Sequence, residues 1–98
     1  MAISLAPVRA AEAAELFKVL GDPTRLSMLA TLRQSSEPIC ICDFTAAYDL
    51  SQPTVSHHMG KLKAAGLVEA HKEGIWVFYR VVREPPAKVA RILAAALG

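Results

Sequence analysis

The sequence lacks an apolar run of the ~20 residues that a helix needs to span a bilayer. It also lacks a secretory signal pattern, internal repeats and low-complexity tracts. We therefore expect one domain over residues 1–98, in the cytoplasm and with no membrane partner. A chain of 98 residues has a modest core, so a second subunit would help to bury apolar surface.

The excess of one sign of charge over the other is also small, with a net charge of +2. The 11 basic residues against 9 acidic ones are too few for a protein that coats nucleic acid by charge alone. Any binding to nucleic acid would depend on individually placed contacts. No acid/base partner for a nucleophile and no substrate pocket is evident, so we do not expect an enzyme.

Cysteine is limited to Cys40 and Cys42. One residue apart, they form a poor disulfide pair, which favours a reducing compartment. Their side chains would diverge by about 200° in a helix but share one side of an extended segment or a frayed first turn. A thiolate at a helix N-terminus has a lowered pKa and suits a soft ion. On spacing alone, two buried structural cysteines remain an equal alternative.

The chain is organised around the stretch from Asp43 to Gly66. A short helix over 43–48, a break at Asp49 and Leu50, and a second helix capped by Ser51 with Pro53 in its first turn form a helix-turn-helix. The second helix has a narrow apolar arc, made by Val55, Met59 and Leu62. We interpret it as a helix that enters the DNA major groove.

The opposite face of this helix carries hydrogen-bonding side chains. The candidate DNA contacts there are Gln52, Thr54, Ser56, His57 and Lys61. Gly60 would let the backbone approach DNA closely, although an ordinary solvated face is the alternative. We expect His58, beside the apolar arc, to be a hydrogen-bonded boundary residue. Adjacent His57 and His58 diverge by about 100°, which disfavours a shared zinc ion.

Two helices precede this unit. The Ala-rich pattern predicts a helix over Val8–Leu20, ended by Gly21. Asp22 is predicted to cap a second helix that has Pro23 at its first position and runs to about Arg33. After a loop, residues 38–41 are predicted to be extended, and the third helix to begin at Cys42 or Asp43.

After Gly66, residues 67–71 and 75–82 flank Lys72, Glu73 and Gly74 as a predicted β-hairpin, or wing. Lys72 and Arg80 could contact phosphates or simply be solvated. The last helix, Ala87–Leu97, is too apolar around its circumference to stand alone. The predicted fold is mainly α with a β-hairpin wing (α+β), a winged helix-turn-helix of order ααααββα. We expect a dimer interface of Leu16, Val89, Ile92, Leu93 and Leu97.

The segments LFKVLGDPTRLSML, ICICDF, LSQPTVSHHMGKLKAAGLV and GIWVFYRV, in this order, resemble the ArsR/SmtB family of metal-responsive winged-helix repressors. The resemblance implies a homodimer, joined by the first and last helices, that binds an inverted-repeat operator and leaves it when an inducer binds. Cys40 and Cys42 match the CxC of the family's arsenic-type site. Gln52, Ser56 and His57 match positions that face DNA.

The sequence also departs from the family's sites. Thr45 occupies the position of a third cysteine in arsenic-type members. The last helix has no Asp, Glu or His for a zinc-type site, and no cysteine precedes Cys40 to complete a cadmium-type site. Sensing of trivalent arsenic or antimony fits best, while thiol-based redox sensing and cadmium or zinc sensing are alternatives. A winged-helix protein that mediates only protein contacts is a further alternative.

Overall fold

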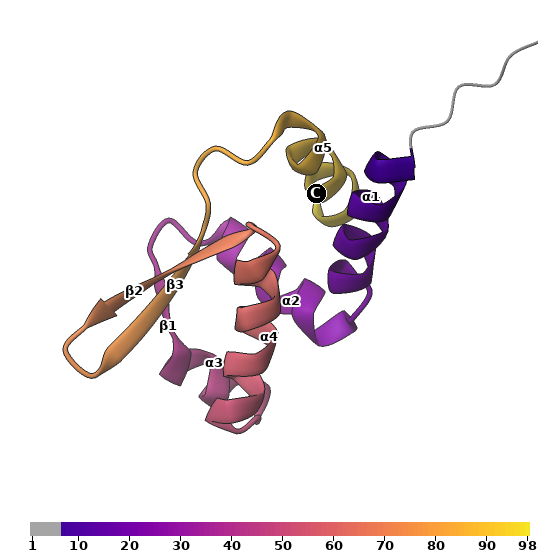
Figure 1. Cartoon of the computed structure of the whole chain (residues 1–98). Coiled ribbons are helices and arrows are strands. Elements are labelled where there is room, and N and C mark those ends of the chain that lie inside the picture. The colour runs from indigo at the N-terminus through magenta and orange to yellow at the C-terminus, as the bar shows by residue number, and fades with distance from the viewer. Residues whose placement is uncertain (1–6) are drawn as a thin grey trace, which may run out of the picture.

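The computed structural model describes residues 7–98. Its elements, in chain order, are α1 (Pro7–Leu20), α2 (Pro23–Gln34), β1 (Ile39–Cys40), α3 (Ile41–Tyr48), α4 (Gln52–Ala64), β2 (Val68–Glu73), β3 (Trp76–Val81) and α5 (Ala87–Leu97) (Figure 1). The predicted succession of four helices, a hairpin and a last helix is confirmed. Of the segment 38–41 predicted to be extended, Ile39–Cys40 forms β1, a strand that joins the hairpin in one sheet, whereas Ile41 already belongs to α3.

Side-chain caps fix the starts of α2 and α4. The Asp22 carboxylate accepts the backbone N–H of Arg25 at 2.8 Å, and Ser51 Oγ accepts the backbone N–H of Thr54 at 3.3 Å. Each cap satisfies a donor that has no partner inside its own helix. Both predicted caps are confirmed: Asp22 sets the start of α2, and Ser51 sets the start of α4, the second helix of the helix-turn-helix.

Replacing Asp22 by alanine is expected to lower the free energy of unfolding by about 1 kcal/mol, because the Arg25 N–H loses its acceptor. Urea denaturation at fixed protein concentration measures this change. Glu12→Ala, at an exposed position within α1, is the control. An equal loss in both variants would contradict the role of Asp22 as a cap.

The turn between α3 and α4 depends on Asp49, which has a left-handed backbone with φ of 53°. Its N–H donates to the carbonyl of Thr45 and closes α3. The helix α3 begins at Ile41, earlier than predicted, because Cys40 rather than a later residue is its N-cap. Gly66, with φ of 76°, follows α4 as expected and lets the chain turn into β2.

The sheet has the strand order β1-β3-β2, and both pairings are antiparallel. Cys40 lies opposite Phe78, and Glu69 lies opposite Arg80. The hairpin turn consists of Gly74, with φ of 62°, and Ile75. Lys72 and Glu73 therefore lie within β2 and not in the turn. The hairpin extends from the helical body in Figure 1.

The core is built by one face each of α2, α3 and α4 and by the base of the sheet, with Leu20 of α1 and Leu93 of α5 added to it. Its largest fully buried side chains are Phe44, Met28, Leu29, Met59, Leu62, Leu67 and Val55. The apolar arc of α4 thus faces inward as predicted. Packing from this side leaves the opposite face of α4 open to solvent.

The helices α1 and α5 lie at the end of the molecule away from the start of α4 (Figure 1). Leu93 of α5 is only 2% exposed and belongs to the core of its own subunit. Leu93, which we expected at the dimer interface, is therefore already covered by its own subunit. Val89, Ile92 and Leu97 are half-buried at the edge of this core, so one side of α5 is already covered.

Within residues 7–98, no helix is both long enough and apolar enough to cross a bilayer.

Candidate nucleic-acid interface and cysteine site

The outward face of α4 carries the predicted contact residues. Gln52, Ser56, His57 and Lys61 are all exposed. A Cβ added at Gly60 would meet no atom within 4 Å apart from its chain neighbours and the nearby backbone of its own helix, so the backbone there is open to the outside. Thr54 is exposed too, but its hydroxyl lies 2.9 Å from Ser51 Oγ and completes the cap. The face offers donors and acceptors of the kind that read base edges.

The position of α4 is fixed from behind by a polar link as well as by the core. Arg25 Nε donates to His58 Nδ1 at 3.4 Å, and His58 Nδ1 lies 3.8 Å from the Asp22 carboxylate. The predicted boundary role of His58 is confirmed. Arg25 also donates to the carbonyl of Val19 at 2.9 Å and so links α1, α2 and α4. This role of Arg25 could not be predicted from the sequence, because an arginine on a helix is usually solvated.

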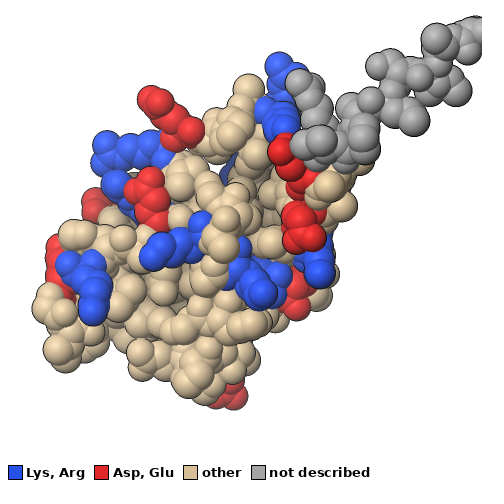
Figure 2. Space-filling model, in the orientation of Figure 1, with Lys and Arg blue, Asp and Glu red and all other residues tan. Residues whose placement is uncertain are grey.

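The wing presents both charged and apolar side chains. Lys72 is exposed. Arg80 donates through Nε at 3.1 Å and Nη2 at 2.9 Å to one carboxylate oxygen of Glu69, its partner across the hairpin. At the tip, Ile75 is 86% exposed and Trp76 is 51% exposed. Figure 2 shows basic side chains interspersed with acidic ones on this face, in keeping with the balanced charge of the chain.

The two cysteines meet at the entrance of α3. Cys40 is buried and Cys42 is exposed, and their sulfur atoms are joined as a disulfide. Two cysteines whose spacing suggested a poor disulfide pair therefore lie with their sulfur atoms close together. Cys40 has an extended backbone and Cys42 a helical one, and this change of conformation turns both side chains to the same side. Their Cα atoms are 5.2 Å apart, within the range that a disulfide allows.

The start of α3 provides a favourable environment for a negatively charged sulfur. The backbone N–H of Cys42 donates to Cys40 Sγ at 3.3 Å. After reduction, this donor and the other unpaired N–H groups of the first turn would stabilise a thiolate. The two soft sulfur donors suit a thiophilic ion. The Thr45 hydroxyl instead donates to the carbonyl of Cys42 at 2.8 Å and closes the first turn.

The two sulfur atoms are the soft ligands that meet at the start of α3. Within residues 7–98, no group of three or more His, Cys, Asp or Glu side chains is placed to hold a metal ion. Tyr79, on β3, adds no negative charge near neutral pH, because burial raises the pKa of its phenol above 10.0. Any further ligand to an ion held by the two cysteines would therefore be something other than a His, Cys, Asp or Glu side chain of residues 7–98.

The cysteine pair adjoins both parts of the candidate DNA interface. The helix α3, which Cys40 caps, packs on α4 and contributes the buried Phe44 to the shared core. The strand β1, which ends at Cys40, pairs with β3 of the wing. A change in geometry at Cys40 can therefore reach the wing through β1, and it can reach α4, the helix whose exposed face is the candidate DNA-reading surface (the reading helix), through α3.

A capped reading helix with an exposed polar face, preceded by a short helix and followed by a hairpin wing, defines a winged helix-turn-helix DNA-binding protein. A family model described as "Bacterial regulatory protein, arsR family" matches residues 22–70. The chain belongs to this family. It is a DNA-binding transcriptional repressor and not an enzyme.

Individual relatives are named for resistance to arsenic compounds and to cadmium. The chain is 42% identical over 82 residues to the arsenical resistance operon repressor of Escherichia coli, covering 84% of this chain and 69% of that protein. It is 41% identical over 63 residues to the cadmium resistance regulatory protein CadC of Listeria innocua, covering 64% and 52%. These relatives support the family and leave the inducer open.

A solved structure agrees with the fold along most of the chain. The homodimeric winged helix-turn-helix DNA-binding domain of a possible ArsR-family regulator from Mycobacterium bovis matches with a TM-score of 0.75 at 28% identity. The match covers 98% of this chain and 86% of that one. The wing and the terminal helices are thus part of a shared architecture.

Proposed function

We propose that this repressor is a homodimer that binds an inverted-repeat operator in the cytoplasm and is released by trivalent arsenic or antimony at Cys40 and Cys42. The observation that carries the proposal is the meeting of both sulfur atoms at the start of α3. This is the helix that packs on the reading helix. The arsenical relative supports the same choice of inducer.

A dimer through α1 and α5 accounts for the apolar surface at that end of the molecule. Phe17 of α1 is 55% exposed, which is unusual for so large an apolar side chain. Leu16 on α1, with Val89, Ile92 and Leu97 on α5, is half-buried and available to a partner. Leu93 would support this surface from beneath. The Mycobacterium bovis neighbour, which is homodimeric, supports the assignment.

The proposed switch acts through the two thiolates. Trivalent arsenic or antimony, when bound, would supply one soft centre for both sulfurs. In that arrangement Cys40 can no longer act freely as the N-cap of α3, so the first turn of α3 and the end of β1 would shift. The resulting conformation must bind the inducer more tightly than the DNA-bound one does, and typical coupling is about 1–3 kcal/mol.

A redox switch at the same residues is the second candidate, and the disulfide between Cys40 and Cys42 favours it. Oxidation joins the two thiols as this disulfide, with loss of two electrons and two protons to an oxidant such as peroxide, and a thiol reductant reverses it. Cadmium or zinc sensing has less support. Zinc sites generally need four ligands, or three and a water, whereas the described residues provide two converging sulfurs.

Footprinting on the DNA upstream of the protein's own gene tests the DNA-binding part of the proposal. We expect two protected half-sites of an inverted repeat, with centres about one helical turn apart. Arsenite, antimonite, cadmium, zinc and peroxide are then added separately to the complex. Protection of a single unpaired site, or of no specific site, would reject the dimeric operator complex.

Gln52→Ala is expected to weaken specific operator binding by about 1–3 kcal/mol, because the side-chain amide is proposed to contact a base edge. Binding to non-specific DNA should stay nearly unchanged. Fluorescence anisotropy with operator and scrambled duplexes measures both affinities. Equal weakening on the two duplexes would refute base reading by Gln52.

Lys72→Ala is expected to lower affinity for operator and scrambled DNA alike and to reduce the slope of log affinity against log salt by about one unit. Arg80→Ala should have the same effect if Arg80 contacts a phosphate. Because Glu69 already offsets part of the charge of Arg80, the change in salt slope should be smaller in Arg80→Ala than in Lys72→Ala. An unchanged salt slope in Lys72→Ala would exclude the phosphate contact.

A further inference from the structure

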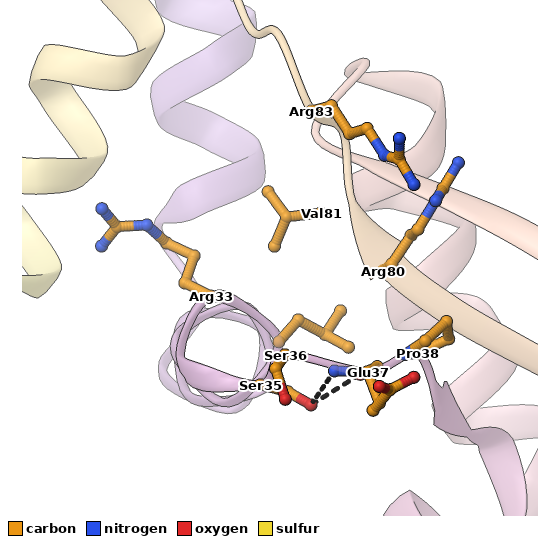
Figure 3. A pocket seen from close by; sticks show the side chains of 9 residues that line it. Arg33, Ser35, Ser36, Glu37, Pro38, Arg80, Val81 and Arg83 are labelled. Carbon is orange, nitrogen blue, oxygen red and sulfur yellow. Dashed lines mark hydrogen bonds between the residues drawn. The ribbon is translucent and has the colours of Figure 1, made fainter.

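A second cluster of charged side chains lies apart from the α4 face and the cysteine pair. It surrounds a hollow of about 420 Å³ bounded by the end of α2, the loop that follows it, and the end of β3. Three arginines line the hollow: Arg33, Arg80 and Arg83 (Figure 3). In Figure 1, these segments lie toward the end of the molecule opposite the start of α4.

The three guanidinium groups differ in what already binds them. Arg33 donates to the carbonyls of Leu93 at 3.2 Å and Gly98 at 3.3 Å, and Figure 3 shows it pointing away from the hollow. It therefore holds α5 in place. It adds positive charge near the hollow but is not placed to bind a ligand there.

Arg80 and Arg83 have donors to spare. Both bonds of Arg80 to Glu69 use its Nε and Nη2 atoms and end on a single oxygen, which leaves Nη1 free. Within residues 7–98, none of the ion pairs involves Arg83. Figure 3 shows the guanidinium ends of Arg80 and Arg83 turned toward one another. Two like charges brought together in this way favour an anion between them.

The remaining polar groups define which anion fits. Ser35 Oγ donates to the carbonyl of Glu37 at 2.6 Å and accepts the N–H of Glu37 at 3.2 Å. By contrast, no side-chain hydrogen bond within residues 7–98 involves Ser36. Glu37 is the one acidic side chain among the lining residues, so the arginines outnumber it. Guanidinium forks match the paired oxygens of phosphates and carboxylates.

We propose that this hollow binds a small oxyanion, a phosphate or phosphate monoester, between Arg80 and Arg83. The site is separate from the cysteines and goes beyond the proposed function. An anion here would bridge the base of the wing and the segment that leads into α5. It would therefore stabilise the folded subunit without occupying the DNA-reading face.

Titration of the full chain with sodium phosphate, followed by thermal unfolding and calorimetry, tests the site. Sodium chloride at equal ionic strength is the reference for screening. We expect saturable stabilisation by phosphate, an affinity about tenfold weaker in Arg83→Gln, and a tighter affinity in Glu37→Gln. Arg91→Gln, which removes an exposed arginine of α5 outside the hollow, should bind phosphate like the unmodified protein.

Three results would overturn the proposal. Chloride could stabilise the protein as much as phosphate does, Arg91→Gln could weaken binding as much as Arg83→Gln, or Glu37→Gln could leave the affinity unchanged. The same phosphate chemistry could come from the DNA backbone. In phosphate-free buffer, Arg83→Gln should keep its operator affinity, and a loss would also overturn the proposal by assigning Arg83, like Arg80, to the DNA backbone. Failure of the unmodified protein to bind any operator would reject the proposed function but not this site.

Discussion

Cys40→Ser and Cys42→Ser are each expected to abolish release of the operator by arsenite while leaving operator affinity unchanged. The serine hydroxyl is a hard, weak ligand at neutral pH, so the soft two-sulfur site is lost. A serine at position 40 remains a good N-cap, so α3 should still start at the same place. In the unmodified protein, arsenite should weaken operator binding by about 5–150-fold, and this response should vanish in both variants.

Two further variants sharpen this test. Thr45→Cys should strengthen the response, because it offers a third sulfur one turn after Cys42. Asp43→Asn, at an exposed position beside the site, is the matched control and should respond like the unmodified protein. Anisotropy of labelled operator across an arsenite titration measures all four proteins. If both serine variants still release DNA at the unmodified midpoint, the cysteine pair is not the inducer site.

Ile92→Glu is expected to convert the dimer to monomer and to reduce specific operator binding by a factor of about 10³ or more. A charge at this half-buried edge of α5 would be buried against the partner without a counter-charge. A monomer cannot hold two half-sites at once, so specific binding falls with the dimer. Sedimentation at micromolar concentration gives the assembly state, and anisotropy gives the affinity.

Arg91→Glu is the control for this prediction, because Arg91 is exposed and lies outside the apolar stripe. It should stay dimeric. Leu93→Glu is unsuitable for the test, since Leu93 lies in the core of its own subunit and the change would unfold it. A stable monomer of the unmodified protein that still binds its operator tightly would contradict the interface.

The sequence predicted the elements that have strong local signals. Asp22 and Ser51 are capping residues placed before prolines, and each begins its helix as expected. The apolar arc of α4 repeats with helical period and faces the core. The hairpin was also clear, although its turn lies at Gly74 and Ile75 because β-sheet pairing extends through Glu73.

The errors arose where tertiary contacts decide the outcome. The spacing of Cys40 and Cys42 predicted that their side chains share one side at the entrance of α3, but not how closely the two sulfur atoms approach. Leu93 belongs to the same apolar stripe as Ile92, and only packing shows which of them faces the subunit's own core. Arg25, Arg80 and Arg83 look like solvated charges in the sequence, yet the fold gives each a specific neighbour or hollow.

Operator anisotropy under arsenite is the most direct test of the central claim that Cys40 and Cys42 release the repressor from DNA. The protein is first reduced with a phosphine, removed from excess reductant under nitrogen, and bound to its labelled operator. We predict that one equivalent of arsenite per subunit lowers the anisotropy to that of free DNA. Adding the same buffer without arsenite or peroxide should have no effect. Anisotropy that stays constant under arsenite but falls with peroxide would contradict metalloid sensing and assign the same cysteines to a redox switch.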